Sequence, residues 1–180
     1  MRTKAILGVA AGVFALVSVA TPVAAQGRTG DVSFGYSILH DSDLEETFPM
    51  GWLVAGGANV GSSLAVVGEA GGNYKSVDFL GTDLNLRVHS FLGGVRVQER
   101  RTKVMPFGQF QVGVVHRGAS ILGEGDSAND FALQPGGGVD IALGSSMGAR
   151  VQADYRIIRS EGETGNEFRV GFGLVFAFKK

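Results

Sequence analysis

The sequence predicts an all-β protein, an eight-stranded antiparallel up-and-down transmembrane β-barrel. Three observations support this fold class: an export signal at the N-terminus, repeated alternation of apolar with small or polar residues, and connections of alternating length. The alternation is clearest over residues 166–178, where every even position from 168 onward carries a large apolar side chain. Because successive side chains of a strand point to opposite faces, this segment has one apolar face and one face of mainly small or charged residues. Such a strand suits a barrel whose outer surface meets lipid.

The N-terminus has the features of a secretory signal peptide. Arg2 and Lys4 form a short positive region, and the uncharged apolar run over residues 5–20 is followed by small residues. The alternative is an uncleaved membrane anchor, but this run is shorter than the ~20 residues of a spanning helix. We therefore expect a signal peptide over residues 1–25 and one β-barrel domain over residues 26–180.

Composition narrows the classes of partner and cofactor. Without Arg2 and Lys4, 14 of the 16 basic residues remain against 17 acidic ones, a net charge of −3, so nothing suggests a nucleic-acid partner. The absence of cysteine excludes a disulfide framework and a lipid-anchoring cysteine. The 29 glycines are dispersed through strand-like segments, which argues against a disordered low-complexity tract.

Eight segments show the period-two alternation of strands, and none shows a helical period of consequence. In the first, apolar residues from Val32 to Ile38 alternate with serine and glycine. The second alternates around Trp52, the third carries Glu69 on its polar face, and the fifth tolerates Pro106 near its start. The predicted strands span residues 31–39, 50–60, 63–75, 83–97, 104–116, 130–143, 148–158 and 166–178.

The fourth segment changes parity along its length. Leu86 lies on an apolar face opposite Arg87 and His89, whereas Val95 continues the apolar face from an odd position. A β-bulge at Gly93-Gly94 would explain the slip. We therefore expect Arg87 and His89 to point into the barrel.

The connections alternate between long and short along the chain, which is the rule for outer-membrane barrels with both termini on the short-turn side. The long ones carry most acidic residues, and basic residues gather on the opposite rim. Solvated loops explain these charges; alternatively, the acidic loops hold divalent cations against anionic lipopolysaccharide or dock a basic partner. The predicted long loops are residues 40–49, 76–82, 117–129 and 159–165, and the short turns are 61–62, 98–103 and 144–147.

Electrostatics decides which face points outward. An arginine on the lipid face at mid-bilayer costs about 2–4 kcal/mol, and an eight-stranded barrel holds packed side chains rather than a channel. Charges inside must therefore be paired. The predicted lumen network is Glu69, Arg87, Gln109, Gln111, Gln134, Asp140, Arg150, Gln152, Asp154, Arg156, Glu167 and Arg169. The predicted lipid-facing residues are Phe131, Leu133, Val139, Ile141, Phe168, Val170, Phe172, Leu174, Phe176 and Phe178.

With this signal peptide, the sorted connections and the stretch from Phe107-Gly108-Gln109 through residues 135–140 to Phe178, the chain resembles the small outer-membrane β-barrel family, the OmpA-like and OmpX-like porin-fold proteins. The resemblance covers the whole mature chain. The resemblance implies that the protein lies in the bacterial outer membrane. It also implies that the barrel-assembly machinery recognises the last strand, which in this family ends in phenylalanine. Here Phe178 is followed by Lys179 and Lys180.

No motif for catalysis, cofactor binding or metal ligation emerges. His116 near Ser120, with Glu124 or Asp126, is the one group that could mimic a lipid hydrolase, and its spacing matches no known motif. No cluster has metal-ligand spacing, and no phosphate-binding glycine loop is present.

The sequence therefore predicts a monomeric outer-membrane protein of structural or surface-interaction role, in contact with lipid and lipopolysaccharide. Three alternatives remain: a narrow gated pore for small solutes, a soluble lipocalin-like calyx binding a small hydrophobic ligand, and an outer-membrane lipid hydrolase. The calyx requires the apolar face to point inward.

Overall fold

The computed structural model describes residues 28–43, 45–79, 82–100, 102–121, 124–160 and 163–179. The predicted signal peptide lies outside these residues. Within them, no helix has the length and apolarity needed to cross a membrane. The strands are β1 (Arg28–Asp41), β2 (Glu46–Phe48), β3 (Met50–Asn59), β4 (Leu64–Phe79), β5 (Thr82–Gln98), β6 (Val104–Ile121), β7 (Glu124–Ala142), β8 (Met147–Ser160) and β9 (Glu163–Lys179).

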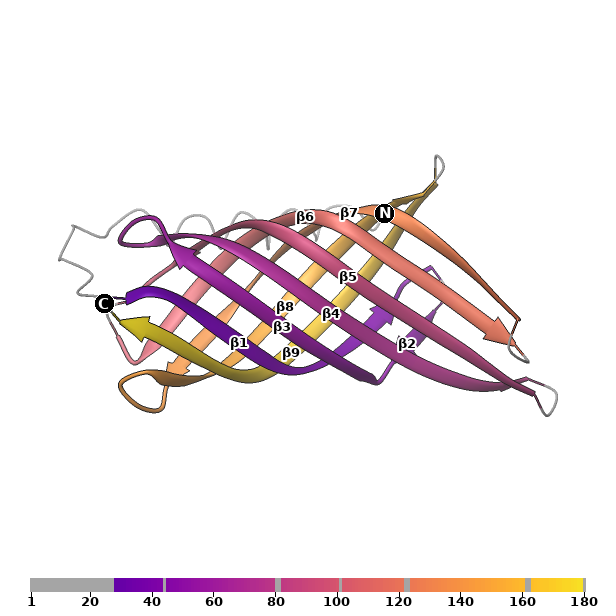
Figure 1. The fold of residues 1–180 in the computed structure, drawn as a ribbon, viewed down its shortest axis with the longest axis horizontal. Coiled ribbons are helices and arrows are strands. Elements are labelled where there is room, and N and C mark those ends of the chain that lie inside the picture. Colours follow the sequence, from indigo (N-terminus) through magenta and orange to yellow (C-terminus); the bar gives the residue numbers. More distant parts are fainter. Residues whose placement is uncertain are drawn as a thin grey trace, which may run out of the picture.

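The strands form a closed antiparallel barrel in which β1 pairs with β2 and β3, each strand from β3 to β8 pairs with the next, and β9 pairs with β1 (Figure 1). β2 and β3 together make one interrupted wall strand beside β1. The register changes between Tyr36↔Trp52 and Leu39↔Phe48, with Pro49 between β2 and β3. Because proline has no N–H for the ladder, it is tolerated at such an irregularity. The predicted all-β, eight-stranded antiparallel barrel is confirmed.

The two ends of the barrel differ, and we call them the terminus end and the hairpin end. Arg28 pairs with Lys179 at the terminus end, where the connections over residues 60–63, 99–103 and 143–146 are short. At the hairpin end, β4–β5 and β6–β7 project beyond the rest of the wall (Figure 1). Residues predicted to be long loops there are therefore mostly strand.

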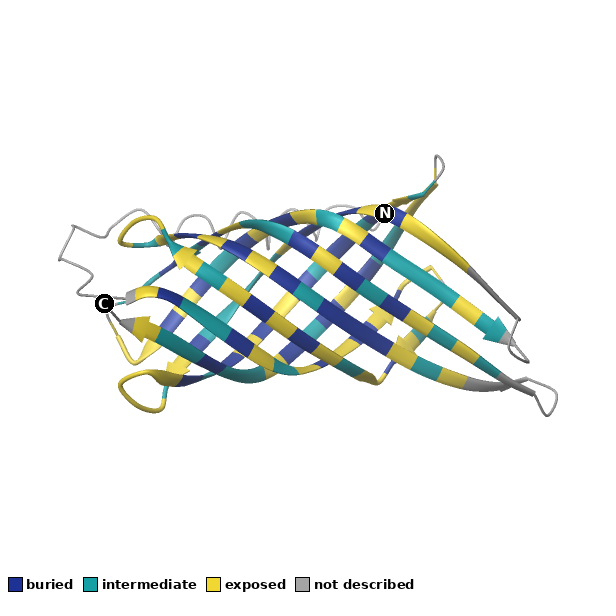
Figure 2. Ribbon diagram, viewed as in Figure 1, coloured by how far each residue is buried: buried dark blue, intermediate teal, exposed yellow. Residues whose placement is uncertain are grey.

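Burial alternates along nearly every strand, so the ribbon is banded (Figure 2). In β8, Arg150 is 3% exposed and its neighbour Val151 is 51% exposed. Phe91, at 61% exposed, also lies on the outer wall. Large apolar side chains thus cover the outside of the barrel, and many polar ones fill the inside.

β5 corrects the predicted change of parity. Its registers with β4 and β6 run without a shift through Gly93 and Gly94, so the expected bulge is wrong. Val88 and Leu92 point inward, while Arg87 is exposed on the outer wall. The prediction failed because it assumed that apolar residues of this strand face lipid throughout, whereas some of them fill the lumen.

Candidate functional site: the polar interior and the outer rim

The lumen near the terminus end holds an ionic group of Asp31, Arg96, Asp140 and Arg150, here called the terminal ionic cluster. Arg150 donates to both Asp140 oxygens, at 2.7 Å from Nε and 2.8 Å from Nη2. Arg96 Nη1 donates to Asp31 Oδ1 at 2.9 Å. The Phe107 ring lies 5.2 Å from the Arg96 guanidinium carbon and 4.9 Å from that of Arg150. An aromatic face attracts cations, so Phe107 offsets part of the repulsion between the arginines.

A second group lies farther along the lumen and is here called the central ionic cluster: Glu69, Asp154, Arg156, Glu167 and Arg169. Arg169 Nη2 donates to Glu69 Oε1 at 2.5 Å and to Asp154 Oδ2 at 2.7 Å. Arg156 Nη1 donates to Glu167 Oε2 at 2.9 Å. All five side chains are buried. A buried ion pair is tolerated only when good geometry and further hydrogen bonds offset the loss of hydration.

Glutamines supply those further hydrogen bonds. Gln109 Nε2 donates to Asp154 Oδ1 at 3.0 Å, and Gln152 Nε2 donates to Asp154 Oδ2 at 2.9 Å. Gln134 Nε2 donates to Glu69 Oε1 at 3.1 Å. Gln152 Nε2 also donates to Glu69 Oε2 at 3.3 Å, so β4, β6, β7 and β8 are connected across the lumen by side chains alone. In a low-dielectric interior such a network holds its members in one arrangement.

A glycine makes room for the central ionic cluster. A Cβ at Gly136 would lie 2.0 Å from Asp154 Oδ1, which accepts from Gln109, and 3.0 Å from the backbone oxygen of Ala153. Any side chain at position 136 must therefore displace Asp154 from its partners.

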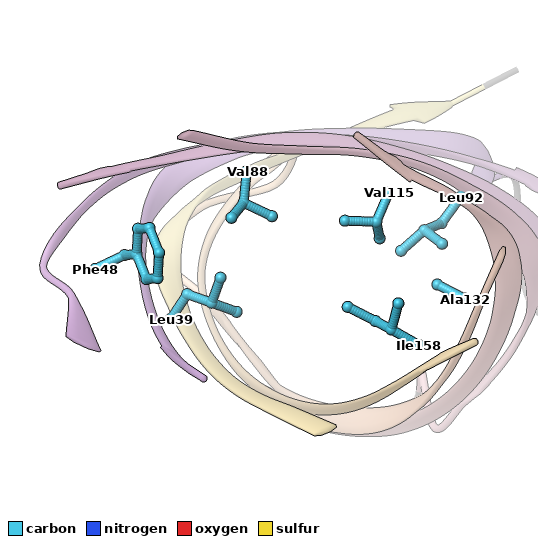
Figure 3. Packing of buried hydrophobic residues seen from close by; sticks show 7 residues of the cluster. All are labelled: Leu39, Phe48, Val88, Leu92, Val115, Ala132 and Ile158. Atoms are coloured by element: carbon cyan, nitrogen blue, oxygen red, sulfur yellow. The ribbon is translucent and has the colours of Figure 1, made fainter. Parts of the chain in front are cut away.

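Apolar side chains fill the next part of the lumen toward the hairpin end (Figure 3). This apolar belt lies on the hairpin side of the ionic clusters in chain order: Val115 follows Gln111 in β6, and Ile158 follows Arg156 in β8. Beyond it, Arg117 Nη2 donates to Asp130 Oδ2 at 2.7 Å. The apolar belt consists of Leu39, Phe48, Val88, Leu92, Val115, Ala132 and Ile158.

The structure brings together all the predicted lumen residues except Arg87. Those buried in the interior are Glu69, Gln109, Gln111, Gln134, Asp140, Arg150, Gln152, Asp154, Arg156, Glu167 and Arg169. The prediction that Arg87 points into the lumen is wrong. Arg87 lies on the outer wall near the hairpin end, where its guanidinium reaches water and avoids the cost of the bilayer centre.

Sequence reasoning missed several interior residues. Asp31 lies two residues before Ser33 and therefore on the same inward face of β1, so alternation could have predicted its position. Arg96 could also have been predicted, because assigning Val95 to the outer apolar face places Arg96 on the inner face of the strand. The apolar belt was missed because alternation alone does not show that some inward-facing positions also carry apolar side chains.

The predicted lipid-facing residues all lie on the outer wall. Phe172 is 49% exposed on β9, whereas Arg169 on the same strand is 1% exposed. This is the reverse of a soluble calyx, which needs the apolar face inside. Phe131, Ile141, Phe168 and Phe178 are exposed like Phe172, and Leu133, Val139, Val170, Leu174 and Phe176 are partly exposed.

A row of hydrogen-bonded side chains, Trp52, Tyr74 and His89, crosses β3, β4 and β5 on the outer wall toward the hairpin end. Trp52 Nε1 donates to Tyr74 Oη at 3.1 Å, and Tyr74 Oη lies 3.0 Å from His89 Nε2. His40 Nδ1 lies 3.0 Å from Thr47 Oγ1. His89 is thus outside the lumen, contrary to prediction, and His40 lies within β1 rather than in a loop. Amphipathic aromatics of this kind occupy membrane–water interfaces.

The residues singled out for hydrolytic chemistry do not meet. His116 and Ser120 are four residues apart on β6, which places them ~13 Å apart along a strand. His116 Nδ1 is instead 2.9 Å from Asn129 Oδ1. The side chains of Glu124 and Asp126 lie outside the described residues. Across the described ranges, no three His, Cys, Asp or Glu side chains are placed to hold a metal ion.

Comparison with known proteins agrees with this architecture. Residues 9–176 match the model of the outer membrane protein beta-barrel domain. No protein of curated function matches the chain in sequence.

Solved structures show the same fold at low sequence identity. Neisserial surface protein A aligns with a TM-score of 0.64 and 11% identity, covering 83% of this chain and 96% of that one. The N-terminal β-barrel domain of Pseudomonas aeruginosa OprF aligns at 0.55 and 13%, covering 85% and 100%. Ail, the attachment invasion locus protein of Yersinia pestis, in complex with the heparin analogue sucrose octasulfate, aligns at 0.54 and 14%, covering 84% and 99%.

Proposed function

The chain belongs to the outer membrane protein β-barrel domain family, and from this premise we propose that it is a structural and surface-interaction protein with a closed lumen. Its family places it in the bacterial outer membrane. The proposal includes removal of residues 1–25 on export, insertion by the barrel-assembly machinery, and a monomer in contact with lipid and lipopolysaccharide.

One observation carries the closed lumen: two differently built layers fill it in series. The terminal and central ionic clusters join β1, β4, β5, β7, β8 and β9 by ion pairs, and the apolar belt follows toward the hairpin end. An ion crossing the barrel would have to break buried charge pairs and then enter an aliphatic constriction. Both steps cost several kcal/mol.

The gated pore is the competing function, and conductance separates the two. Wild-type protein refolded into planar bilayers is expected to show no discrete conductance steps. A double variant, Val115→Gly with Ile158→Gly, thins the apolar belt but leaves the ion pairs intact. We expect this variant to stay closed, because the ionic clusters still block the path. Frequent steps in wild type would instead establish a pore.

The surface role rests on the projecting hairpins. Their acidic residues, with Glu163 at the start of β9, suit divalent cations bound to anionic lipopolysaccharide, or a basic partner. The test compares a deletion strain complemented with wild type or with a variant whose residues 119–126 are replaced by a two-residue turn. If the hairpins interact, the shortened barrel restores assembly but not detergent resistance or surface binding. Full restoration of both would assign the role to the barrel wall alone.

Membrane placement itself is tested by heat-modifiable gel migration and fractionation. A detergent-stable barrel migrates faster before boiling than after it, and the mature protein is recovered with outer membranes. Recovery in the periplasm without detergent would contradict the proposal.

A further inference from the structure

Near the hairpin end the backbone ladder of the barrel wall stops early between β3 and β4, as it also does between β7 and β8 beyond Phe131↔Arg159. β3 and β4 pair only as far as Met50↔Tyr74, and β2 pairs with β1. Among the described residues, β4 from Lys75 to Phe79 pairs with β5 alone. The β1–β2 and β4–β5 hairpins separate toward this end (Figure 1). Two strand edges therefore flank a gap in the wall with no ladder between them.

An open hollow of about 780 Å³ lies at this gap. Pro49 and Met50 line it from the β2–β3 junction, Tyr74 and Ser76 from β4, and Arg87 from β5. Met50 is 65% exposed, so the hollow presents apolar surface beside hydroxyl groups and a guanidinium.

The hollow lies at the level of lipid headgroups. Unpaired backbone groups cannot lie in hydrocarbon without a cost of several kcal/mol each, so the gap must be above the acyl chains. The hydrogen-bonded row of Trp52, Tyr74 and His89 indicates the same level, because Tyr74 both belongs to this row and lines the hollow. Interfacial tryptophan and tyrosine sit where headgroups meet acyl chains.

The charge in the hollow suits an anion. Arg87 is exposed, and its stem runs along Gly118, where an added Cβ would lie 3.3 Å from Arg87 Cγ. The Lys75 amine is already paired with Glu46. The Arg87 guanidinium can donate two parallel N–H hydrogen bonds, which suits a phosphate. Exposed Met50 and Pro49 beside Arg87 favour an anion that also carries an apolar part.

We propose that this hollow binds the headgroup of a phosphate-bearing membrane lipid, with Arg87 holding the phosphate and Met50 contacting the glycerol and upper acyl region. The edge of β4 that has no ladder partner offers backbone N–H groups as further donors to the headgroup. The proposal rests on membrane placement and is independent of lumen closure and of hairpin interactions.

Trp52 makes the site measurable, because it is the one tryptophan in the chain and donates to Tyr74 in the hollow. The protein is refolded into phosphatidylcholine vesicles containing increasing brominated phosphatidylglycerol, whose bromines quench nearby tryptophan. Quenching of wild type is expected to exceed that from equal amounts of brominated phosphatidylcholine. Arg87→Gln is expected to lower this preference for the anionic lipid about tenfold, as for one lost charge-assisted hydrogen bond, and Arg87→Lys to restore part of it.

Arg159→Gln is the matched control, because Arg159 is also exposed on the outer wall but lies on β8, outside the hollow. It is expected to keep the wild-type preference, and heat-modifiable migration verifies that each variant is folded. Three results would overturn the proposal: no anionic preference in wild type, an equal loss in Arg159→Gln, or full competition by soluble glycerol phosphate. Any of these with a non-conducting, membrane-inserted barrel would leave the proposed function standing.

Discussion

The two halves of the lumen are filled by opposite means, although both use inward-facing residues of the same strands. Toward the terminus end, arginines and carboxylates form paired, glutamine-supported clusters. Toward the hairpin end, aliphatic side chains pack against one another. The ionic half depends on every partner being present, because a charge left alone in the interior is costly. The apolar half loses stability only in proportion to the volume removed.

The largest expected effect is in the ionic half. Arg169→Ala leaves Glu69 and Asp154 without their shared cation, and should lower the free energy of unfolding by about 3–5 kcal/mol. Urea unfolding in phospholipid vesicles, followed by Trp52 fluorescence, measures it. Arg169→Met with Glu69→Gln and Asp154→Asn should recover much of the loss, because no buried charge is then unpaired. A loss below about 1 kcal/mol for Arg169→Ala would show that water solvates the cluster.

The second-largest loss in the free energy of unfolding is expected from a larger side chain introduced into the ionic half. Gly136→Ala forces Asp154 away from its partners, and overpacking of this kind costs about 1–3 kcal/mol. Gly144→Ala is the control, because a Cβ there meets nothing within 4 Å. Equal unfolding midpoints for the two variants would contradict the close fit around Asp154.

The apolar half should tolerate a small deletion better. Ile158→Val removes one methylene from the apolar belt and should cost about 0.5–1.5 kcal/mol. The same urea titration compares it with Arg169→Ala. If Ile158→Val is as costly as Arg169→Ala, the contrast between the two halves fails.

The smallest effect should be at the outer rim. Arg87 is exposed on the wall, so Arg87→Gln should change the free energy of unfolding by less than about 0.5 kcal/mol. Its effect is expected on lipid preference alone. A large loss of stability would mean that Arg87 supports the wall itself.

Sequence reasoning went furthest where one strand face is uniformly apolar. β8 and β9 alternate without interruption, so the inner face expected for Arg150, Arg156 and Arg169 is the face on which the structure has them. β5 carries leucine and valine on both faces, so the sequence pattern does not show that Arg87 points outward while Arg96 points inward. Parity along one strand cannot show that a lumen is apolar at one end and ionic at the other.

The hairpin end was the least predictable part. Beyond the apolar band, strand residues have no lipid to face, so their side chains need not alternate, and β4, β6 and β7 continue as strands through segments that look like loops. The wall gap depends on how Pro49 shifts the register between β2 and β3. That shift is a property of strand pairing, which period-two patterns do not contain.

Site-directed spin labelling tests the arrangement of the two faces most directly, because the chain has no native cysteine. Labels at Phe91→Cys and Phe172→Cys, with Asn129→Cys on the exposed hairpin as reference, are measured in vesicles for collisions with oxygen and with a water-soluble nickel chelate. We expect oxygen-rich, nickel-poor environments at positions 91 and 172 and the opposite at 129. Nickel accessibility at position 172 equal to that at 129 would place the phenylalanine face in water and contradict the account.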